Sequence, residues 1–296
     1  MPTRRIDVDL GWGTISALEW PAPERADAAR TVLLLHGGGA DSAWLSWGDL
    51  GERLSAAGHR VIAPDHPGFG HSATAPWPAT QERLVAYVGD LVDALALDRY
   101  AVGGLSLGGA LTLGHVLDRP ARAAGAMLVG TYGIMPRLGA GLAAPAVQLA
   151  SWAMVRSGLM TPLMRAYATS AARMERGMSA LVRDPARRTP DLIDAVLEAT
   201  RREGALETFA QWQRSEVGWR RLRTDYTPRL SELRTPVLMV HGERDDGVPL
   251  PVARAAAGLL PRAELVVAPG AGHWVQRDAP DLSARSMIAF LDRLEW

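Results

Sequence analysis

The chain has 296 residues, and its 32 basic side chains balance 32 acidic ones, so its formal net charge is zero. This length suits one large α/β domain, with or without an inserted segment, and can bury a sizeable core. A neutral chain argues against a nucleic-acid-binding protein, which usually carries a basic surface. The sequence contains no cysteine and no lysine. Disulfides, thiolate nucleophiles, Schiff-base chemistry and a P-loop lysine are therefore excluded.

No targeting or membrane segment is expected. The first ten residues carry charges and have no apolar core, so they do not read as a signal peptide. Residues 138–155 contain no charged side chain, but Pro145, Gln148 and the modest length favour a buried or cap helix over a membrane span. We therefore expect a cytoplasmic protein with no membrane span.

The first part of the chain predicts a β-sheet flanked by helices. Residues 5–10 and 14–20 alternate apolar with polar side chains, which is typical of an antiparallel strand pair. Denser apolar runs predict strands buried on both faces, at residues 31–36, 59–64, 100–104 and 124–130. Helical patterns lie between these runs, at residues 50–57, 80–95 and 106–117. This alternation predicts a mostly parallel sheet with helices on both faces.

The alternation of strand and helix patterns stops in the middle of the chain. From residue 135 to about 230 no strand pattern appears, and threonine–proline pairs at Thr161 and Thr189 predict helix starts. Strand patterns resume at 236–242 and 264–269, before a last helix. The sequence therefore predicts an α/β core formed by residues 1–134 and 231–296, interrupted by a helical insertion at 135–230.

One serine lies where a nucleophile is expected. The segment V-G-G-L-S-L-G-G places Ser106 between a predicted strand and a predicted helix, within a G-x-S-x-G pattern. Gly104 and Gly108 leave room for a tight turn that exposes the hydroxyl. A serine hydroxyl is a poor nucleophile, so it needs a base, an acid that orients the base, and donors for the oxyanion.

The base and the acid are expected at the carboxyl ends of later strands. His273 lies in G-A-G-H-W, just past the strand at 264–269, and is the candidate base. Asp245 and Asp246 follow the strand at 236–242, and the spacing to Val248 and Pro249 favours Asp245 as the acid. The turn after the strand at 124–130 contains no carboxylate that could replace it.

The oxyanion donors are expected from two backbone segments. The run H-G-G-G at 36–39 follows a strand and presents unhindered N–H groups, among them that of Gly38. The N–H of Leu107 opens the helix after the serine, where the helix dipole favours negative charge. The chain order Ser106, Asp245, His273 is the order found in α/β-hydrolases.

With these segments in view, the chain resembles the α/β-hydrolase superfamily. The matching segments are H-G-G-G at 36–39, D-H-P-G-F-G-H-S at 65–72, G-L-S-L-G-G at 104–109, H-G-E-R-D at 241–245 and G-H-W at 272–274. The resemblance implies an eight-stranded, mostly parallel sheet and makes the insertion a helical cap. A weaker resemblance is to the hydrolases that cleave carbon–carbon bonds of ring-fission products. Two residues of this chain, Leu105 and Ala40, depart from the sequence pattern of that group.

The main prediction is a serine hydrolase that cleaves a carboxylic ester or related acyl bond of a small apolar substrate, with neither metal nor cofactor. The alternatives are a carbon–carbon bond hydrolase of ring-fission-type diketones, a non-hydrolytic enzyme on this fold (lyase, haloperoxidase or acyltransferase) and a ligand receptor. A monomer or homodimer is expected. Tryptophans are predicted to line the substrate pocket, at Trp44, Trp152, Trp212, Trp219 and Trp274.

Overall fold

A single eight-stranded sheet forms the centre of the protein. The computed structural model describes residues 2–23, 30–202, 204 and 206–296. The sheet order is β1-β2-β4-β3-β5-β6-β7-β8, with β1 antiparallel to β2, β2 antiparallel to β4, and the other neighbours parallel. The strands are β1 (Arg4–Asp9), β2 (Thr14–Trp20), β3 (Arg30–Leu35), β4 (His59–Pro64), β5 (Tyr100–Leu105), β6 (Ala123–Val129), β7 (Val237–Gly242) and β8 (Ala263–Ala268).

Helices cover both faces of the sheet, as the strand–helix alternation predicts. One face carries α1 (Ala43–Ala56), α10 (Val275–Asp278) and α11 (Pro280–Asp292). The other face carries α2 (Gln81–Ala94), α3 (Leu107–Asp118) and α9 (Leu250–Leu259). The central strands β5, β6 and β7 are buried along their whole length. Their continuous apolar sequence follows from this covering on both sides.

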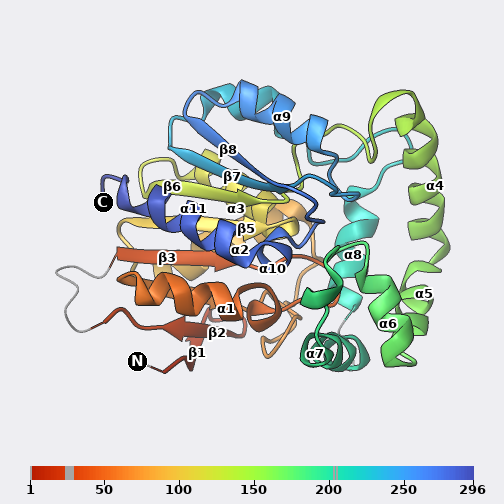
Figure 1. Ribbon diagram of the computed structural model, residues 1–296, viewed down its shortest axis with the longest axis horizontal. Coiled ribbons are helices and arrows are strands. Elements are labelled where there is room, and N and C mark those ends of the chain that lie inside the picture. The colour runs from red at the N-terminus through yellow and green to blue at the C-terminus, as the bar shows by residue number, and fades with distance from the viewer. Residues whose placement is uncertain (1, 24–29, 203, 205) are drawn as a thin grey trace.

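A helical segment connects β6 to β7. Its α-helices are α4 (Ala144–Ser157), α5 (Met160–Tyr167), α6 (Ala171–Met178), α7 (Pro190–Arg201) and α8 (Glu207–Glu216), with 3₁₀ turns at Gly141–Ala143, Pro185–Arg187 and Thr227–Glu232. Figure 1 shows α4 to α8 grouped at the end of the sheet opposite the two termini. We call this segment the cap; the domain boundaries at 134/135 and 230/231 stay predictions. No helix in the described part of the chain is long and apolar enough to cross a membrane.

Two local predictions need correction. Helix α1 begins at Ala43 rather than near residue 50, because Ser42 caps it by accepting a hydrogen bond from Leu45 N–H at 3.2 Å. Thr161 does not cap α5, since that helix already begins at Met160 after Leu159. Thr189 does cap α7, where it accepts a hydrogen bond from Leu192 N–H at 3.3 Å.

A buried histidine makes the stability of this core sensitive to acid. The Tyr100 hydroxyl lies 2.5 Å from Nε2 of His115, inside the contact between β5 and α3. Burial, reinforced by the charges of Arg119 and Arg122, lowers the pKa of His115 from 6.5 to about 4. The unfolded chain therefore binds more protons than the folded one between these values, and stability falls as pH falls from about 6.5 to about 4.

The substitution His115→Gln is expected to flatten this pH dependence, because the amide oxygen can still accept from Tyr100 and does not titrate. Within this pH window one proton accounts for up to about 1.4 kcal/mol of unfolding free energy per pH unit. Urea unfolding at pH 7 and pH 5 should give a smaller difference for the variant than for the parent protein. An unchanged difference would contradict the assignment to His115.

Candidate active site

Ser106 occupies a strained turn between β5 and α3. Its backbone φ is +51° and its ψ is −110°, a conformation that costs a residue with a side chain about 1–3 kcal/mol. Backbone hydrogen bonds hold the turn: Ser106 N–H donates to the carbonyl of Val129 at 2.9 Å, and the Ser106 carbonyl accepts from Tyr132 at 3.0 Å and Ala110 at 3.1 Å. These contacts fix Ser106 at the carboxyl end of the sheet.

The glycines around Ser106 are required by close backbone contacts. A Cβ atom at Gly104 would lie 2.1 Å from the backbone of Gly108, and one at Gly108 would lie 2.1 Å from the carbonyl oxygen of Leu35. Both clashes would be with backbone atoms, which cannot move aside as a flexible side chain can. The G-x-S-x-G pattern is therefore a steric requirement of this turn.

Asp245 and His273, predicted as the acid and the base, are in direct contact. Nδ1 of His273 lies 2.8 Å from Oδ2 and 3.0 Å from Oδ1 of Asp245. The Asp245 side chain is completely buried, whereas that of His273 keeps 12% of its surface exposed. An Asp carboxylate bonded to Nδ1 fixes the tautomer in which Nε2 is free to accept a proton.

The environment of Asp245 keeps this carboxyl ionised. Its Oδ1 also accepts backbone N–H bonds from Gly247 at 2.8 Å and Val248 at 2.9 Å. Burial alone raises the pKa of Asp245, but the hydrogen bond and charge of His273 and the N–H of Val248 hold the net pKa below its usual value. Asp246, the neighbouring candidate, has a side chain that is 73% exposed and paired with Arg183.

Ser106 and His273 line the same cavity. A Cβ atom at Gly130 would lie 3.3 Å from Nδ1 of His273, and Gly130 follows Val129, the residue that holds the Ser106 backbone. Among the described residues no hydrogen bond joins the Ser106 hydroxyl to the imidazole. Such bonds are often long in free enzymes and tighten when substrate binds.

Two of the predicted oxyanion donors line this cavity as well. Gly38 and Leu107 are among its lining residues. The N–H of Gly37 is already bonded to Oδ2 of Asp41 at 2.7 Å, which leaves the next residues of the glycine run as donors. Leu107 is the first residue of α3, where a backbone N–H has no partner within the helix. The ring of Phe209 lies so close to Gly38 that a Cβ there would clash at 2.2 Å.

Two buried polar side chains, His36 and Asp41, support the glycine run at 37–39, which we call the candidate oxyanion loop, and the sequence analysis did not assign them this role. Nε2 of His36 accepts from His66 N–H at 2.9 Å, so Nδ1 carries the proton and donates to the Gly37 carbonyl at 2.7 Å. Burial lowers the pKa of His36 to about 3. Asp41 accepts from Gly37 N–H, from Ser42 N–H at 2.7 Å and from the Ser46 hydroxyl at 2.7 Å. The signal that the sequence offered for this role of Asp41 is a carboxylate two residues after the glycine run.

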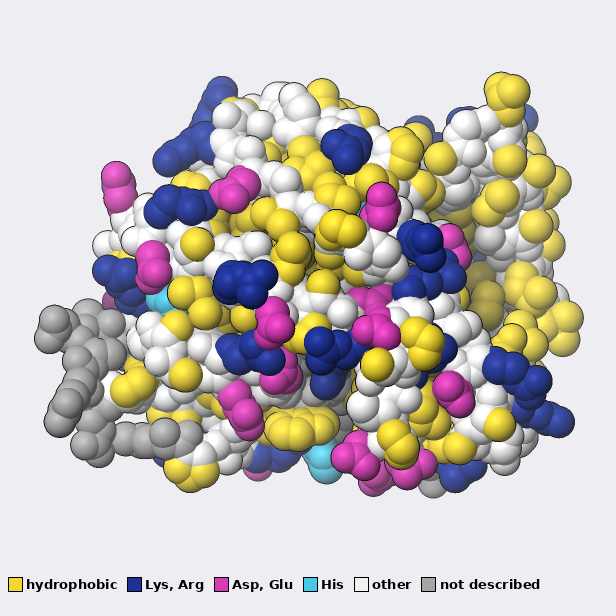
Figure 2. Space-filling model, in the orientation of Figure 1, with side chains coloured by type: hydrophobic (Ala, Val, Ile, Leu, Met, Phe, Trp, Pro, Cys, Tyr) yellow, Lys and Arg dark blue, Asp and Glu magenta, His cyan; other side chains and the backbone are white. Residues whose placement is uncertain are grey.

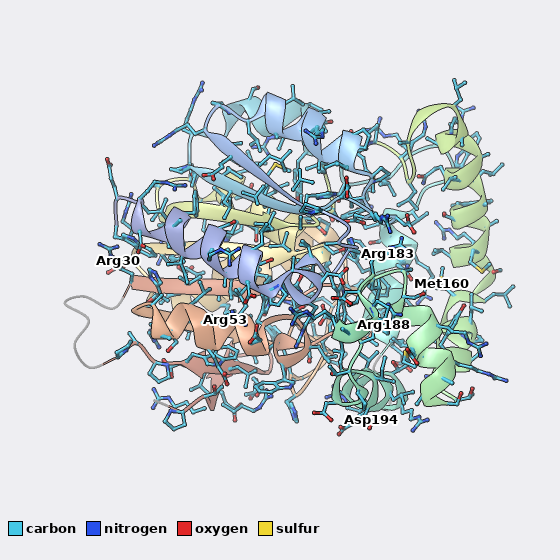
Figure 3. The ribbon with its side chains drawn as sticks, viewed as in Figure 1. Arg30, Arg53, Met160, Arg183, Arg188 and Asp194 are labelled. Atoms are coloured by element: carbon cyan, nitrogen blue, oxygen red, sulfur yellow. The ribbon has the colours of Figure 1, made fainter. Side chains whose placement is uncertain are left out.

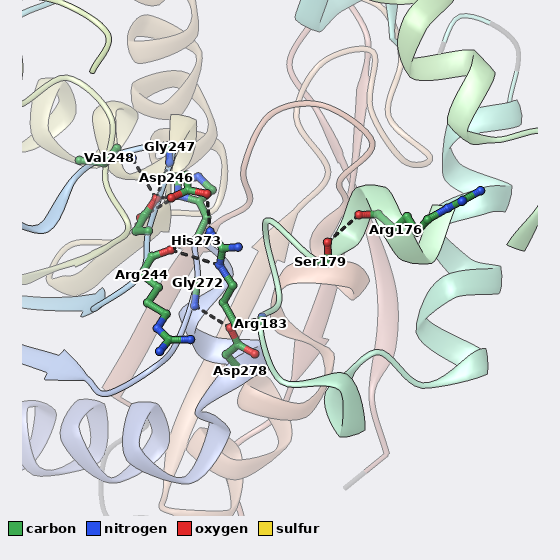
Figure 4. A network of polar contacts seen from close by, with 11 residues as sticks. Arg176, Ser179, Arg183, Arg244, Asp246, Gly247, Val248, Gly272, His273 and Asp278 are labelled. Atoms are coloured by element: carbon green, nitrogen blue, oxygen red, sulfur yellow. Dashed lines mark hydrogen bonds and ion pairs between the residues drawn. The ribbon is translucent and has the colours of Figure 1, made fainter. Parts of the chain in front are cut away.

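The loop between α6 and α7 connects the cap to the loops that carry Asp245 and His273, and Figure 4 shows this network. Arg183 donates to the carbonyl of Arg244 and pairs with Asp246. Asp278 accepts from Gly272 N–H at 2.6 Å and from Arg183 N–H at 2.7 Å. Figure 3 places Arg183 at the boundary between the cap and the core. The cap therefore helps to position the segments that carry Asp245 and His273.

The predicted pocket tryptophans fall into two groups. Trp212 and Trp274 line the cavity and are nearly buried. Trp44 and Trp219 are about half exposed and lie outside that lining, with the Trp219 ring under the guanidinium of Arg220 at 4.1 Å. Trp152 also lies outside it and packs against the core. Cavity residues that sequence reasoning did not single out include Tyr132, Met174, Met178, Phe209 and Gln213.

The sequence matches the profile of the alpha/beta hydrolase fold over residues 30–280. The chain therefore belongs to the α/β-hydrolase fold family, and the eight-stranded sheet and its solved structural neighbours agree with this.

Among similar curated proteins is a 2-hydroxy-6-oxononadienedioate/2-hydroxy-6-oxononatrienedioate hydrolase 1 of Dechloromonas aromatica, 30% identical over 88% of this chain and 86% of the relative. A hydrolase of the same description from Cupriavidus pinatubonensis is 29% identical over 89% and 87%. Among solved structures, a meta-cleavage product hydrolase from Pseudomonas fluorescens has a TM-score of 0.77, with 24% identity over 97% of both chains. A thermophilic esterase from Thermogutta terrifontis has a TM-score of 0.73, with 24% identity over 98% of both chains.

The two neighbouring aspartates give the first test of this site. Asp245→Asn is expected to lower hydrolytic turnover by about four orders of magnitude without unfolding the protein, because an amide favours the wrong histidine tautomer. Asp246→Asn, which removes only an exposed pairing with Arg183, is expected to cost less than tenfold, that is, below about 1.4 kcal/mol. Steady-state kinetics and thermal melts of both variants measure this, and reversed effects would transfer the acid role to Asp246.

Asp41→Asn tests the support behind the candidate oxyanion loop. The amide nitrogen cannot accept a hydrogen bond, so the N–H of either Gly37 or Ser42 loses its acceptor. We expect kcat to fall by at least about tenfold with little change in KM, because a displaced oxyanion donor weakens transition-state binding. Asp49→Asn, on the exposed side of α1, is the control. If the two variants had equal kcat and KM, Asp41 would not support the oxyanion donors.

Proposed function

We propose that the protein is a serine hydrolase that cleaves a carboxylic ester, or a related acyl bond, of a small and uncharged apolar substrate. The observation that carries the proposal is that His273, hydrogen-bonded to the buried Asp245 at 2.8 Å, lines the same cavity as the strained Ser106. Membership of the α/β-hydrolase fold family supports it, but a fold alone does not choose a reaction.

The mechanism follows from these side chains. Nε2 of His273 takes the hydroxyl proton of Ser106 as its oxygen attacks the substrate carbonyl. Asp245 holds the imidazole and stabilises its protonated form. The N–H groups of Gly38 and Leu107 bind the oxyanion, and His273 then gives its proton to the leaving group. Water attacks the acyl-enzyme with the same base, which releases the acid and restores Ser106.

The cavity walls support an apolar and uncharged substrate. Its volume is about 490 Å³, which suits a small molecule. Methionines and aromatic side chains dominate the lining: Met135, Met164, Met174, Met178, Tyr132, Tyr167, Phe209, Trp212 and Trp274. Among the described lining residues none is Arg, Lys, Asp or Glu. A charged substrate would lose its hydration there without gaining an ion pair, apart from any contact with His273.

Carbon–carbon bond hydrolysis is the second candidate, and the names of the relatives favour it. Several similar curated proteins are hydrolases of 2-hydroxy-6-oxo dienoates and dienedioates. Those compounds carry carboxylates, for which the described walls of this cavity offer no arginine or lysine. Esters or ketones without a carboxylate therefore suit this cavity better.

A labelling and substrate panel tests both candidates. A fluorophosphonate should modify Ser106 stoichiometrically, and Ser106→Ala should lose the label and lower turnover by several orders of magnitude. Among matched substrates, chromogenic esters with uncharged acyl chains should give a higher kcat/KM than 2-hydroxy-6-oxo-dienoates. A higher kcat/KM for the dienoates would establish the second candidate. Labelling of another serine would contradict the proposal as a whole.

A further inference from the structure

The outer surface of the cap exposes an unusual number of apolar side chains. Leu142, Val147, Leu149, Leu159 and Leu163, which we call the cap face, are between 41% and 103% exposed. They lie on α4, on α5 and on the turns beside them. Figure 2 shows hydrophobic side chains gathered along the right-hand edge of the molecule, where Figure 1 places these two helices. Contiguous exposed apolar surface of this kind usually marks a binding surface.

Helix α4 lacks a polar outer face. Its fully buried residues are Gln148 and Val155, while Leu149 and most of its alanines face outward. The Gln148 amide donates to the Gly218 carbonyl at 2.6 Å and accepts from Leu138 N–H at 2.9 Å. The helix is therefore held inward by Gln148 together with the apolar side chains of Trp152 and Val155, and it is also apolar outward. A surface helix of a globular protein normally presents a polar face to water.

The part of the chain that carries the cap face is rich in positive charge. Residues 137–178 contain five arginines and one glutamate, a net charge of +4 in a chain whose net charge is zero. Arg156, Arg165 and Arg176 are exposed, and none of them forms an ion pair with a described residue. The 18 residues from Leu138 to Val155 carry no charge at all. Apolar side chains bordered by arginines are typical of helices that lie in a membrane interface.

The cap face adjoins the cavity that contains Ser106. Helix α5 contributes Met164 and Tyr167 to the cavity lining, and Leu163 to the cap face. Tyr167 is 42% exposed, so the cavity wall reaches the molecular surface at this helix. A partner that covered the cap face would therefore lie beside the wall of the cavity.

We propose that the cap face docks on an anionic lipid surface, with its leucines in the headgroup region and its arginines against lipid phosphates. The docked helix α5 then lies at the lipid surface together with the part of the cavity wall that it forms. A second copy of the chain fits this surface less well, because a symmetric interface would bring the two sets of arginines together. The charge complementarity is with an anionic bilayer.

Vesicle binding tests this proposal without any measurement of catalysis. The whole protein is sedimented with phosphatidylcholine vesicles, and with vesicles that also contain phosphatidylglycerol. We expect binding to the mixed vesicles, weakened by added salt, and much less binding to phosphatidylcholine alone. Arg156→Gln with Arg165→Gln should weaken binding about thirtyfold, at about 1 kcal/mol for each arginine. The charge-matched control is Arg254→Gln with Arg285→Gln, two exposed arginines outside the cap, and should bind like the parent.

A second pair of variants tests the contribution of the apolar side chains to vesicle binding. Leu142→Gln with Leu149→Gln should abolish sedimentation with mixed vesicles, whereas Leu142→Met with Leu149→Met should retain it. Thermal melts verify that each variant is folded. The proposal is overturned if the parent protein does not sediment, if it binds both vesicle types equally, or if the glutamine variant still binds. It is also overturned if light scattering shows a dimer that Leu142→Gln with Leu149→Gln dissociates, since the occupant is then a second copy.

Discussion

The strained turn at Ser106 is the constraint on which the rest of the structure depends. A φ of +51° is unfavourable for serine, and it persists because the neighbouring backbone leaves no alternative. The Ser106 N–H is held by β6, and Gly104 and Gly108 bring strand and helix into backbone contact. The same contacts set the position of Leu107 N–H at the start of α3. One local conformation therefore fixes both the candidate nucleophile and one oxyanion donor relative to the sheet.

The glycine run separates two buried polar side chains from the cavity. His36 and Asp41 lie behind this run and bond its carbonyl and N–H groups, so neither side chain is among the residues that line the cavity. Burial raises the pKa of Asp41 to about 6, although Ser46, Ser42 and Gly37 donate to it. The burial of this carboxyl is unfavourable, but its hydrogen bonds hold the glycine run rigid. A site arranged in this way can stabilise a developing oxyanion without offering a charge to the ground-state substrate.

The sequence predicts the local parts of this site better than the distant ones. Ser106, Asp245 and His273 can be proposed from the sequence because each follows a recognisable strand, and the carboxyl ends of parallel strands meet at one edge. The tryptophans were harder, because their environment depends on how the cap helices pack. Trp212 lies within α8 and faces the cavity, whereas α8 ends at Glu216, so Trp219 lies beyond the helix and outside its periodicity. The hydrophobic periodicity of the sequence alone does not show that α8 ends at Glu216.

Two sets of polar contacts hold parts of the cap in place, one between the loop after α6 and the core and one within the cap. Asp278 and Arg183 attach the loop after α6 to the loops that carry Asp245 and His273, and Gln148 attaches α4 to the segment after α8. Helix α4 is held by the hydrogen bonds of Gln148 together with the inward packing of Trp152 and Val155. Leu149, the single leucine of α4, is half exposed, and this exposure to water is a cost for the isolated chain. A surface that carries such a cost and borders the cavity is better explained by an external partner than by folding.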